Sequence, residues 1–432
     1  MRIKVLIPAL CLLTACTGRD TDHSTHIIDL QAAISSPVSQ MLLSDVANDI
    51  EIIPLETKEE TIYSRSLHII SCKNGILLCP GGGDTARPIM LFDRQGKFVR
   101  YIGSLGQGPE EMLIHPSIGY DEEKQEIIVP DWSDLKVYGI NGKFKRKLFQ
   151  YKEEGEYWYA NRDTREIRDY RFVDGYHIFR RMFPVPTLNG AWQIMVLDYK
   201  GDLIAKIADP ISSKHEDKIA VDLMTAMPST YWQSIAPVMS FYHGIHSVLF
   251  DANDTLYQLP ASKDRLIPRY LMKTGSEAFT PKVLHSADQT GDFLNKYIQP
   301  RDILETQDNI FLVAEKGEYS YLCRFNKKTG EVQSIRNKGE VIHQKVMGIH
   351  VRTVDAPEFT DDLAGGCTFF PKHINDNEWI GYIPAEKLLK EIDIKELEKK
   401  KVKLPHRKQQ LIEVLRNLKE DDNPVLMIVK LK

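Results

Sequence analysis

The stretch LFDRQGKFVRYI at residues 91–102 has the pattern of a tight β-hairpin. Apolar residues lead into the turn letters DRQG and resume after them, and the glycine supplies the positive φ that such a turn needs. The same unit returns as VYGINGKFKRKL at 137–148, as VLDYKGDLIAKI at 196–207 and, in a weaker form, as LCRFNKKTGEV at 322–332. Each copy predicts two strands joined by a turn, with roughly alternating apolar positions as in a half-buried hairpin.

The spacing of these copies indicates a ring of β-sheets. The turn glycines Gly96, Gly142 and Gly201 follow one another at intervals of 46 and 59 residues. Repetition at about 40–50 residues with strands only is typical of a propeller, in which each repeat is one four-stranded blade. One blade cannot bury both of its faces, but a ring of blades can. We therefore predict an all-β fold over residues 49–432, a six-bladed β-propeller of four-stranded antiparallel blades.

The C-terminal part predicts how the ring is completed. Residues 385–401 are rich in Lys, Glu and Leu, and residues 409–419 place leucine and valine at helical spacing. We expect an amphipathic helix that faces the ring, because its charges are mixed; a helix for a membrane surface or a partner is the alternative. The apolar run VLMIVKL at 425–431 is expected to be a strand that pairs near residues 50–55 and closes the ring.

The N-terminus predicts export. The basic start MRIK is followed by an apolar run over residues 5–13 and by LTAC at 13–16. This is the pattern of a secretory signal, and the run is too short to span a bilayer, which takes roughly 20 apolar residues. Because the run ends on Cys16, residues 1–15 look like a bacterial lipoprotein signal peptide, and an ordinary cleaved signal is the alternative. Residues 16–48 are expected to be the lipidated cysteine and a tether, with a short helix within 31–48.

Charge and cysteine content narrow the classes of partner. Without residues 1–15 the chain keeps 54 basic and 60 acidic side chains, which argues against the concentrated basic face of a nucleic-acid binder. No Cys-x-x-Cys occurs, so a zinc or redox site has no support. We expect buried free thiols, with a Cys72–Cys79 bridge as the alternative. The cysteines beyond Cys16 are Cys72, Cys79, Cys323 and Cys367.

A set of motifs gives a family resemblance. They are IPLET at 53–57, FDRQGKF at 92–98, IGSLGQGPEE at 102–111, DTLY at 254–257, PRY at 268–270 and LKEDDNPVL at 418–426. With them the chain resembles the six-bladed β-propeller lipoproteins of Gram-negative gut bacteria, which are similar in shape to NHL-repeat propellers. One departure is Gly139, where the family often has Asp. The resemblance implies a lipidated Cys16 at the outer membrane and assigns no catalytic residue. Asp20 and Asp22 leave the membrane face, surface or periplasmic, open.

Aromatic residues in loop-like segments are the candidate ligand contacts. Trp132 beside Asp131, and Trp158 within YWY at 157–159, could stack on sugar rings or peptide side chains. Most other aromatic residues are expected to pack between blades. His243 and His246 would face opposite sides of a strand, and the glycines at 103–108 lack the lysine of a phosphate loop. We therefore predict no metal and no cofactor.

These observations predict an envelope-anchored lipoprotein that contacts the membrane through its N-terminal lipid. We expect a non-enzymatic binding or scaffold role for a glycan, a peptide or an envelope protein. The alternative is a glycan-active propeller hydrolase or lyase. That enzyme would need an axial pocket with two carboxylates about 5–10 Å apart, one of them desolvated. A sensor module is a third possibility.

Overall fold

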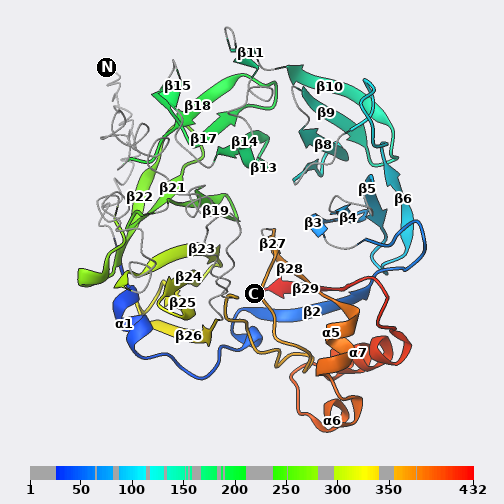
Figure 1. Cartoon of the computed structure of the whole chain (residues 1–432), viewed down its shortest axis with the longest axis vertical. Coiled ribbons are helices and arrows are strands. Elements are labelled where there is room, and N and C mark those ends of the chain that lie inside the picture. Colours follow the sequence, from blue (N-terminus) through cyan, green and yellow to red (C-terminus); the bar gives the residue numbers. More distant parts are fainter. Residues whose placement is uncertain are drawn as a thin grey trace, which may run out of the picture.

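A computed structural model shows six blades arranged in a ring, each built on four antiparallel strands (Figure 1). This arrangement confirms the predicted six-bladed β-propeller. In five of the blades the strands pair in the order of the chain, from an innermost strand near the axis to an outermost strand at the rim. The structure describes residues 26–63, 66–80, 87–112, 117–130, 134–150, 152–153, 156–157, 167–181, 186–187, 190–210, 237–250, 252–280, 296–339, 355–375 and 377–432.

Five blades follow one another along the chain, each named from its innermost strand outward. The first has β3 (Ser66–Cys72), β4 (Gly75–Pro80), β5 (Ile89–Phe92) and β6 (Phe98–Ile102). The second has β7 (Gly119–Asp121), β8 (Glu126–Pro130), β9 (Asp134–Gly139) and β10 (Phe144–Gln150). The third has β13 (Ile167–Val173), β14 (Tyr176–Arg181), β17 (Ile194–Leu197) and β18 (Leu203–Ile207). The fourth has β19 (Val238–Tyr242), β20 (Ile245–Leu249), β21 (Thr255–Leu259) and β22 (Ile267–Lys273). The fifth has β23 (Gln299–Glu305), β24 (Asn309–Lys316), β25 (Tyr319–Asn326) and β26 (Val332–Lys338).

The sixth blade joins the two ends of the domain. It consists of β27 (His373–Ile374), β28 (Glu378–Ile383), β29 (Val425–Leu431) and β2 (Ala47–Pro54). β29 lies between β28 and β2, and Ile53 is opposite Leu426 in the antiparallel register. The predicted closure by the last strand is therefore confirmed, since the first and last blades cannot separate without breaking this ladder.

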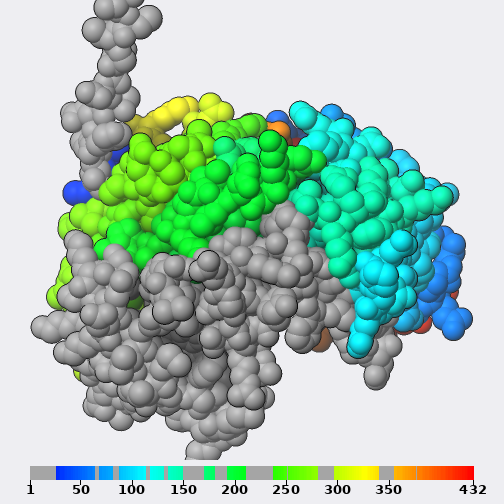
Figure 2. Space-filling view, turned by 90° about the horizontal axis from the view of Figure 1, so that it is seen from above, coloured from blue at the N-terminus to red at the C-terminus, as the bar shows by residue number. Residues whose placement is uncertain are grey.

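The core of the ring is divided among the contacts between neighbouring blades. Among the described residues, one apolar cluster lies at each of the six junctions. The strand β4 is an example of how one strand contributes to two of these clusters. Its Ile76 and Leu78 pack toward the sixth blade, while Leu77 and Cys79 pack toward the second. Alternate side chains of one strand thus serve two junctions. Figure 2 shows the flank of the ring, where neighbouring blades adjoin.

The hairpins predicted from the repeated unit join the third and fourth strands of their blades. Gly96, Gly142, Gly201 and Gly330 all have positive φ in these turns. At Gly96, with φ 83°, a β-carbon would lie 2.1 Å from the carbonyl oxygen of Pro54, so only glycine fits between this turn and β2. The turn is also bonded across the junction, because the backbone N–H of Glu56 donates to the carbonyl oxygen of Gly96 at 2.8 Å.

The N-terminal segment differs from the expected tether, because the domain begins well before residue 49. β1 (His26–Asp29) pairs in parallel with the outer strand β22 and adds a fifth strand to the fourth blade. α1 (Leu30–Ser35) follows, capped by Asp29, and buries Leu30, Ala33 and Ile34 against the fourth and fifth blades. The exposed edge of β22 supplies backbone hydrogen-bond partners for β1. The four residues of β1 are too few to indicate this pairing from the sequence. The helix expected within 31–48 lies at the start of this segment.

Three short helices follow β28 and cover the junction of the fifth and sixth blades (Figure 1). They are α5 (Ala385–Glu391), α6 (Ile394–Lys399) and α7 (Pro405–Asn417). α7 buries Leu411, Ile412 and Leu415, which confirms an amphipathic helix with its apolar side toward the ring. Arg407 also donates two hydrogen bonds to Asp49 of β2. In the part of the chain that the structure describes, no helix is both long and apolar enough to cross a bilayer.

The remaining elements are small. They are the 3-10 helices η1 (Leu43–Asp45) and η5 (Gly275–Glu277), and the strand pairs β11 (Lys152–Glu153) with β12 (Glu156–Tyr157) and β15 (Pro186–Thr187) with β16 (Gly190–Ala191). The four cysteines beyond Cys16 form no disulfide bond and are buried, as predicted. Burial raises the pKa of Cys79 and of Cys323 to about 12, which keeps both as unreactive thiols.

Candidate ligand-binding pocket on the ring axis

A cavity of about 820 Å³ opens at one end of the ring axis. Five of the six innermost strands reach it, namely β3, β7, β13, β19 and β27. All innermost strands run in the same direction through a propeller, so the turns that follow them meet on one face. The lining comes from the ends of these strands and from their turns: His68, Ile70 to Lys73, Arg94, Ile118 to Tyr120, Glu122, Arg171 to Asp174, Phe241, Ile374, Asn375, Asn377 and Glu378.

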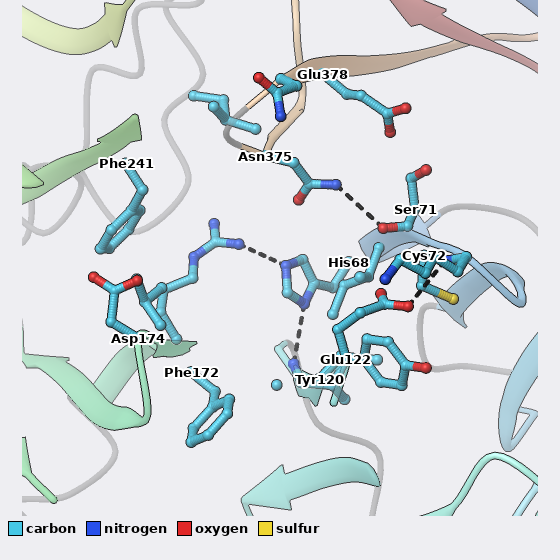
Figure 3. Close-up of a pocket in the computed structure, with 18 of the residues that line it drawn as sticks. His68, Ser71, Cys72, Tyr120, Glu122, Phe172, Asp174, Phe241, Asn375 and Glu378 are labelled. Atoms are coloured by element: carbon cyan, nitrogen blue, oxygen red, sulfur yellow. Dashed lines mark hydrogen bonds between the residues drawn. The ribbon is translucent and has the colours of Figure 1, made fainter. Parts of the chain in front are cut away.

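His68 lies at the centre of the hydrogen bonds in this pocket (Figure 3). The side chain is 4% exposed, and its Nδ1 is 3.0 Å from the backbone N–H nitrogen of Ile118, which precedes β7. Its Nε2 is 2.6 Å from Nη1 of Arg171 on β13. The His373 ring, on β27, lies with its centroid 5.3 Å away. One imidazole therefore touches groups from three other blades.

The first and sixth blades meet in a compensated group of charges at the pocket wall. Arg94 donates to Ser71 Oγ and to a carboxylate oxygen of Glu51, both at 2.6 Å. Glu378 accepts a hydrogen bond from Lys430, and one of its oxygens is 3.9 Å from Arg94. These cations and carboxylates neutralise one another, so they hold the wall in place and leave little net charge there.

The turn after β3 is tied to the second blade. The backbone N–H of Lys73 donates to Glu122 at 3.3 Å, and the Asn74 amide donates to the Tyr120 hydroxyl at 3.4 Å. Burial raises the pKa of Tyr120 to about 12, so this group stays a neutral hydroxyl at the pocket edge. The pocket therefore offers a phenol that can both donate and accept.

The third and fourth blades supply a carboxylate and two aromatic rings. Asp174 occupies a left-handed turn position, with φ 52°, and its carboxylate is 3.1 Å from Nε2 of His246 and 3.6 Å from Nζ of Lys263. Burial lowers the pKa of Lys263, and the Asp174 charge opposes this effect. Phe172 and Phe241 project beside Asp174 and form an apolar part of the wall (Figure 3).

Three cations act on Asp302, which lies on the innermost strand β23. Burial raises the pKa of Asp302, while the positive charges of Arg180, Lys372 and Arg171 oppose this shift. These three cations come from the third and sixth blades. The buried carboxylate of Asp302 therefore lies near positive charges from two other blades.

The ligand contacts predicted from the sequence are different residues from those that line the axial pocket. Cys16, Asp131, Trp132 and Trp158 lie outside the described residues, so their predictions are not tested. Among the remaining aromatic residues, Trp192 and Tyr242 are buried, and Phe241 lines the pocket. The one sequence feature that pointed to this pocket was His68, a polar residue in the apolar run LHII at 67–70. A buried histidine alone does not indicate a binding site.

The two histidines considered as a metal pair do not lie on one strand, as the sequence pattern had suggested. His243 occupies a turn with φ 43°, whereas His246 is buried on β20 beside Asp174. Within the described ranges, no group of three or more His, Cys, Asp or Glu side chains is arranged to hold a metal ion.

The closed ring and its polar pocket define the class of protein, a six-bladed β-propeller with a ligand-sized cavity at one end of its axis. The chain belongs to the family described as a domain of unknown function, DUF4934, whose model matches residues 25–430.

Two solved structures of Bacteroides proteins are similar to this chain. A Bacteroides fragilis protein, named as exported, superposes with a TM-score of 0.58 at 15% identity, over 92% of this chain and 98% of that one. A Bacteroides vulgatus member of the DUF4221 family gives 0.47 at 13% identity, over 90% and 97%. No curated protein matches this chain. The first similarity supports the propeller fold.

Proposed function

We propose that this protein is an exported, lipid-anchored propeller of the outer membrane that binds a small glycan or peptide in its axial pocket. The N-terminal pattern that ends at Cys16 supports the anchor. The similarity to a Bacteroides fragilis protein named as exported agrees with a location in the cell envelope. The role is binding without chemistry at the pocket.

The observation that carries this proposal is the convergence of five blades on one pocket. Its volume of about 820 Å³ lies in the range of small-molecule sites. Apolar side chains such as Phe172 and Phe241 share the wall with hydroxyl, amide and charged groups. Hydrogen bonds between blades hold these groups in position, so a ligand would meet a largely preformed site.

The carboxylates of the wall favour binding over hydrolysis. A glycosidase needs one carboxylic acid to protonate the leaving group and a second carboxylate to act as base or nucleophile. Here Glu378 is bonded to Lys430, Asp174 contacts His246 and Lys263, and Glu122 accepts from a backbone N–H. These contacts tie the three carboxylates to the pocket wall and give them a structural role.

A pocket-filling variant tests the proposal. The full-length protein, purified in detergent, is screened by thermal shift and calorimetry against oligosaccharides and short peptides. Asn377→Trp fills the pocket from the turn after β27, and Val99→Trp places the same side chain on the exposed outer strand β6 as a control. We expect a ligand that binds the wild type and V99W but not N377W. The absence of any ligand, or equal binding to N377W, would contradict pocket binding.

The anchor is tested separately. Cys16→Ser is expected to move the protein from the membrane fraction to the soluble fraction, because it removes the acylated thiol. Intact-mass measurement of the wild type should then show the added acyl chains. Retention of the variant in the membrane fraction would contradict lipidation at Cys16.

A further inference from the structure

One carboxylate of the axial pocket is held by buried groups on one side and exposed on the other. Asp174 is 49% exposed and lines the cavity, whereas the side chains of His246 and Lys263 beside it are only 1% and 2% exposed. Both neighbours lie near the same oxygen, because His246 Nε2 is 3.1 Å and Lys263 Nζ is 3.6 Å from Oδ2. An ionised carboxylate has about four lone-pair sites on its two oxygens. Asp174 can therefore keep these two contacts and also accept hydrogen bonds from a ligand.

The backbone fixes the place of this carboxylate. Asp174 and Gly175 are the two residues between β13 and β14, whose ends pair as Val173 with Tyr176. Their φ values are 52° and 80°, and positive φ at both central residues is typical of a type I′ hairpin turn, which favours the sequence Asp-Gly. A ligand would thus meet an acceptor that is already in position, which lowers the entropy cost of binding.

The charges at Asp174 favour a neutral donor over an ammonium group. The Lys263 ammonium, 3.6 Å from Oδ2, compensates the carboxylate and would repel a second cation at the same place. A hydroxyl group carries no charge, and it can donate a hydrogen bond to a carboxylate. Alcohol groups are therefore the ligand groups that suit this acceptor.

Phe172 gives the pocket an aromatic surface beside this acceptor. It lies two residues before Asp174, near the end of β13, and both residues line the cavity. Its position depends on Gly119 of the second blade, because a β-carbon at Gly119 would lie 2.6 Å from Phe172 Cβ. Figure 3 shows the Phe172 ring and the Asp174 carboxylate on the same side of the pocket. A ligand that reaches Asp174 can therefore also contact this ring.

We propose that the axial pocket takes a neutral sugar, with a pyranose ring stacked on Phe172 and neighbouring hydroxyl groups that donate to Asp174. A pyranose has an apolar C–H face that can pack on an aromatic ring, and its hydroxyl groups lie around the edge of that face. A peptide backbone offers isolated N–H donors without such a face beside them. The inference rests on the proposed binding function and deepens it, because it selects an uncharged glycan as the ligand class.

Matched sugars test the ligand class on the wild type. Calorimetry uses the full-length protein in a detergent without a sugar headgroup, so that the detergent does not compete for the pocket. The probes are neutral trisaccharides of glucose, galactose and mannose, each paired with an amino sugar or uronate of the same linkage, and short peptides. At least one neutral trisaccharide is expected to bind about tenfold or more tightly than its charged partners. Its permethylated form, which has no hydroxyl donor, should bind at least about tenfold more weakly.

Conservative variants test the two contact residues. Asp174→Asn keeps an acceptor oxygen and suits the left-handed turn but removes the charge, so the affinity for the neutral sugar should fall about tenfold or more. Phe172→Leu keeps an apolar side chain without the ring and should lower the affinity about threefold or more. Asp198→Asn, in the turn between β17 and β18, and Phe144→Leu, on the outer strand β10, are matched controls that should leave the affinity unchanged. Thermal unfolding checks that each variant is folded, and the sugar series on the wild type depends on no variant.

The outcomes separate this inference from the proposed function. Charged sugars or peptides that bind the wild type at least as tightly as every neutral sugar would overturn neutral-sugar recognition, and loss of their binding in N377W would leave pocket binding intact. An unchanged affinity in folded Asp174→Asn or Phe172→Leu protein would also overturn the inference. If no sugar binds, neutral-sugar recognition fails, and the peptide part of the screen with N377W decides the proposed function by itself.

Discussion

Acidification should destabilise the propeller through His177, a fully buried histidine on β14. Its Nδ1 is 2.8 Å from the Tyr170 hydroxyl, and the two rings are stacked with centroids 6.0 Å apart. Burial lowers the pKa of His177 from 6.5 to about 4, against small opposing effects of the Tyr199 backbone and Asp198. The folded ring therefore stays neutral at pH values where the unfolded chain is protonated.

The sign and size of the effect follow from these two pKa values. Above about pH 6.5 the imidazole is neutral in both states and stability does not depend on it. Between about pH 6.5 and 4 only the unfolded chain binds the proton, so each lost pH unit costs about 1.4 kcal/mol of unfolding free energy. From pH 7.5 to pH 5.0 the loss from this one group comes to about 2 kcal/mol.

The assay is urea unfolding at pH 7.5 and pH 5.0 for the wild type and for His177→Asn, whose amide oxygen can replace Nδ1 as partner of Tyr170. The variant is less stable at both pH values but should lose about 2 kcal/mol less than the wild type between them. Paired carboxylates such as Glu126, whose pKa is lowered by Arg146, stay ionised in both proteins at pH 5.0. An equal pH dependence in the two proteins would refute the assignment to His177.

Two further predictions concern ring closure and the blade turns. Ile428→Ala on β29 should cost about 3–4 kcal/mol in urea unfolding, because the side chain is fully buried between the sixth and first blades, whereas Val99→Ala on the exposed rim should change stability by less than about 0.5 kcal/mol. Equal effects of the two variants would contradict the closure of the core by the last strand. Gly96→Ala should cost at least about 2 kcal/mol, because its β-carbon would meet the Pro54 carbonyl oxygen, whereas Gly175→Ala, with a similar φ of 80° but open space around it, should cost only about 1 kcal/mol. A Gly96 variant no less stable than the Gly175 variant would show that the junction relaxes freely.

The hairpins and the closing strand were predictable because their determinants are local. The turn after Phe92 requires the glycine at position 96. In β4, successive side chains point to opposite faces and pack against two different blades, which is a local property of a strand. The run at 425–431 is apolar enough to require a partner on each side, and the ring supplies β28 and β2. The start of the domain was misplaced because β1 has only four residues, and its pairing depends on the free edge of β22.

The amino-acid sequence by itself determined the export pattern, the repeated hairpin and the propeller class, since each of these depends on residues that are close together in the chain. Only the tertiary structure decided where a ligand could bind. His68, Ile118 and Arg171 come from three blades, and no spacing along the chain relates one to another. They meet at the His68 ring because the closed ring brings the innermost strands of different blades together around its axis.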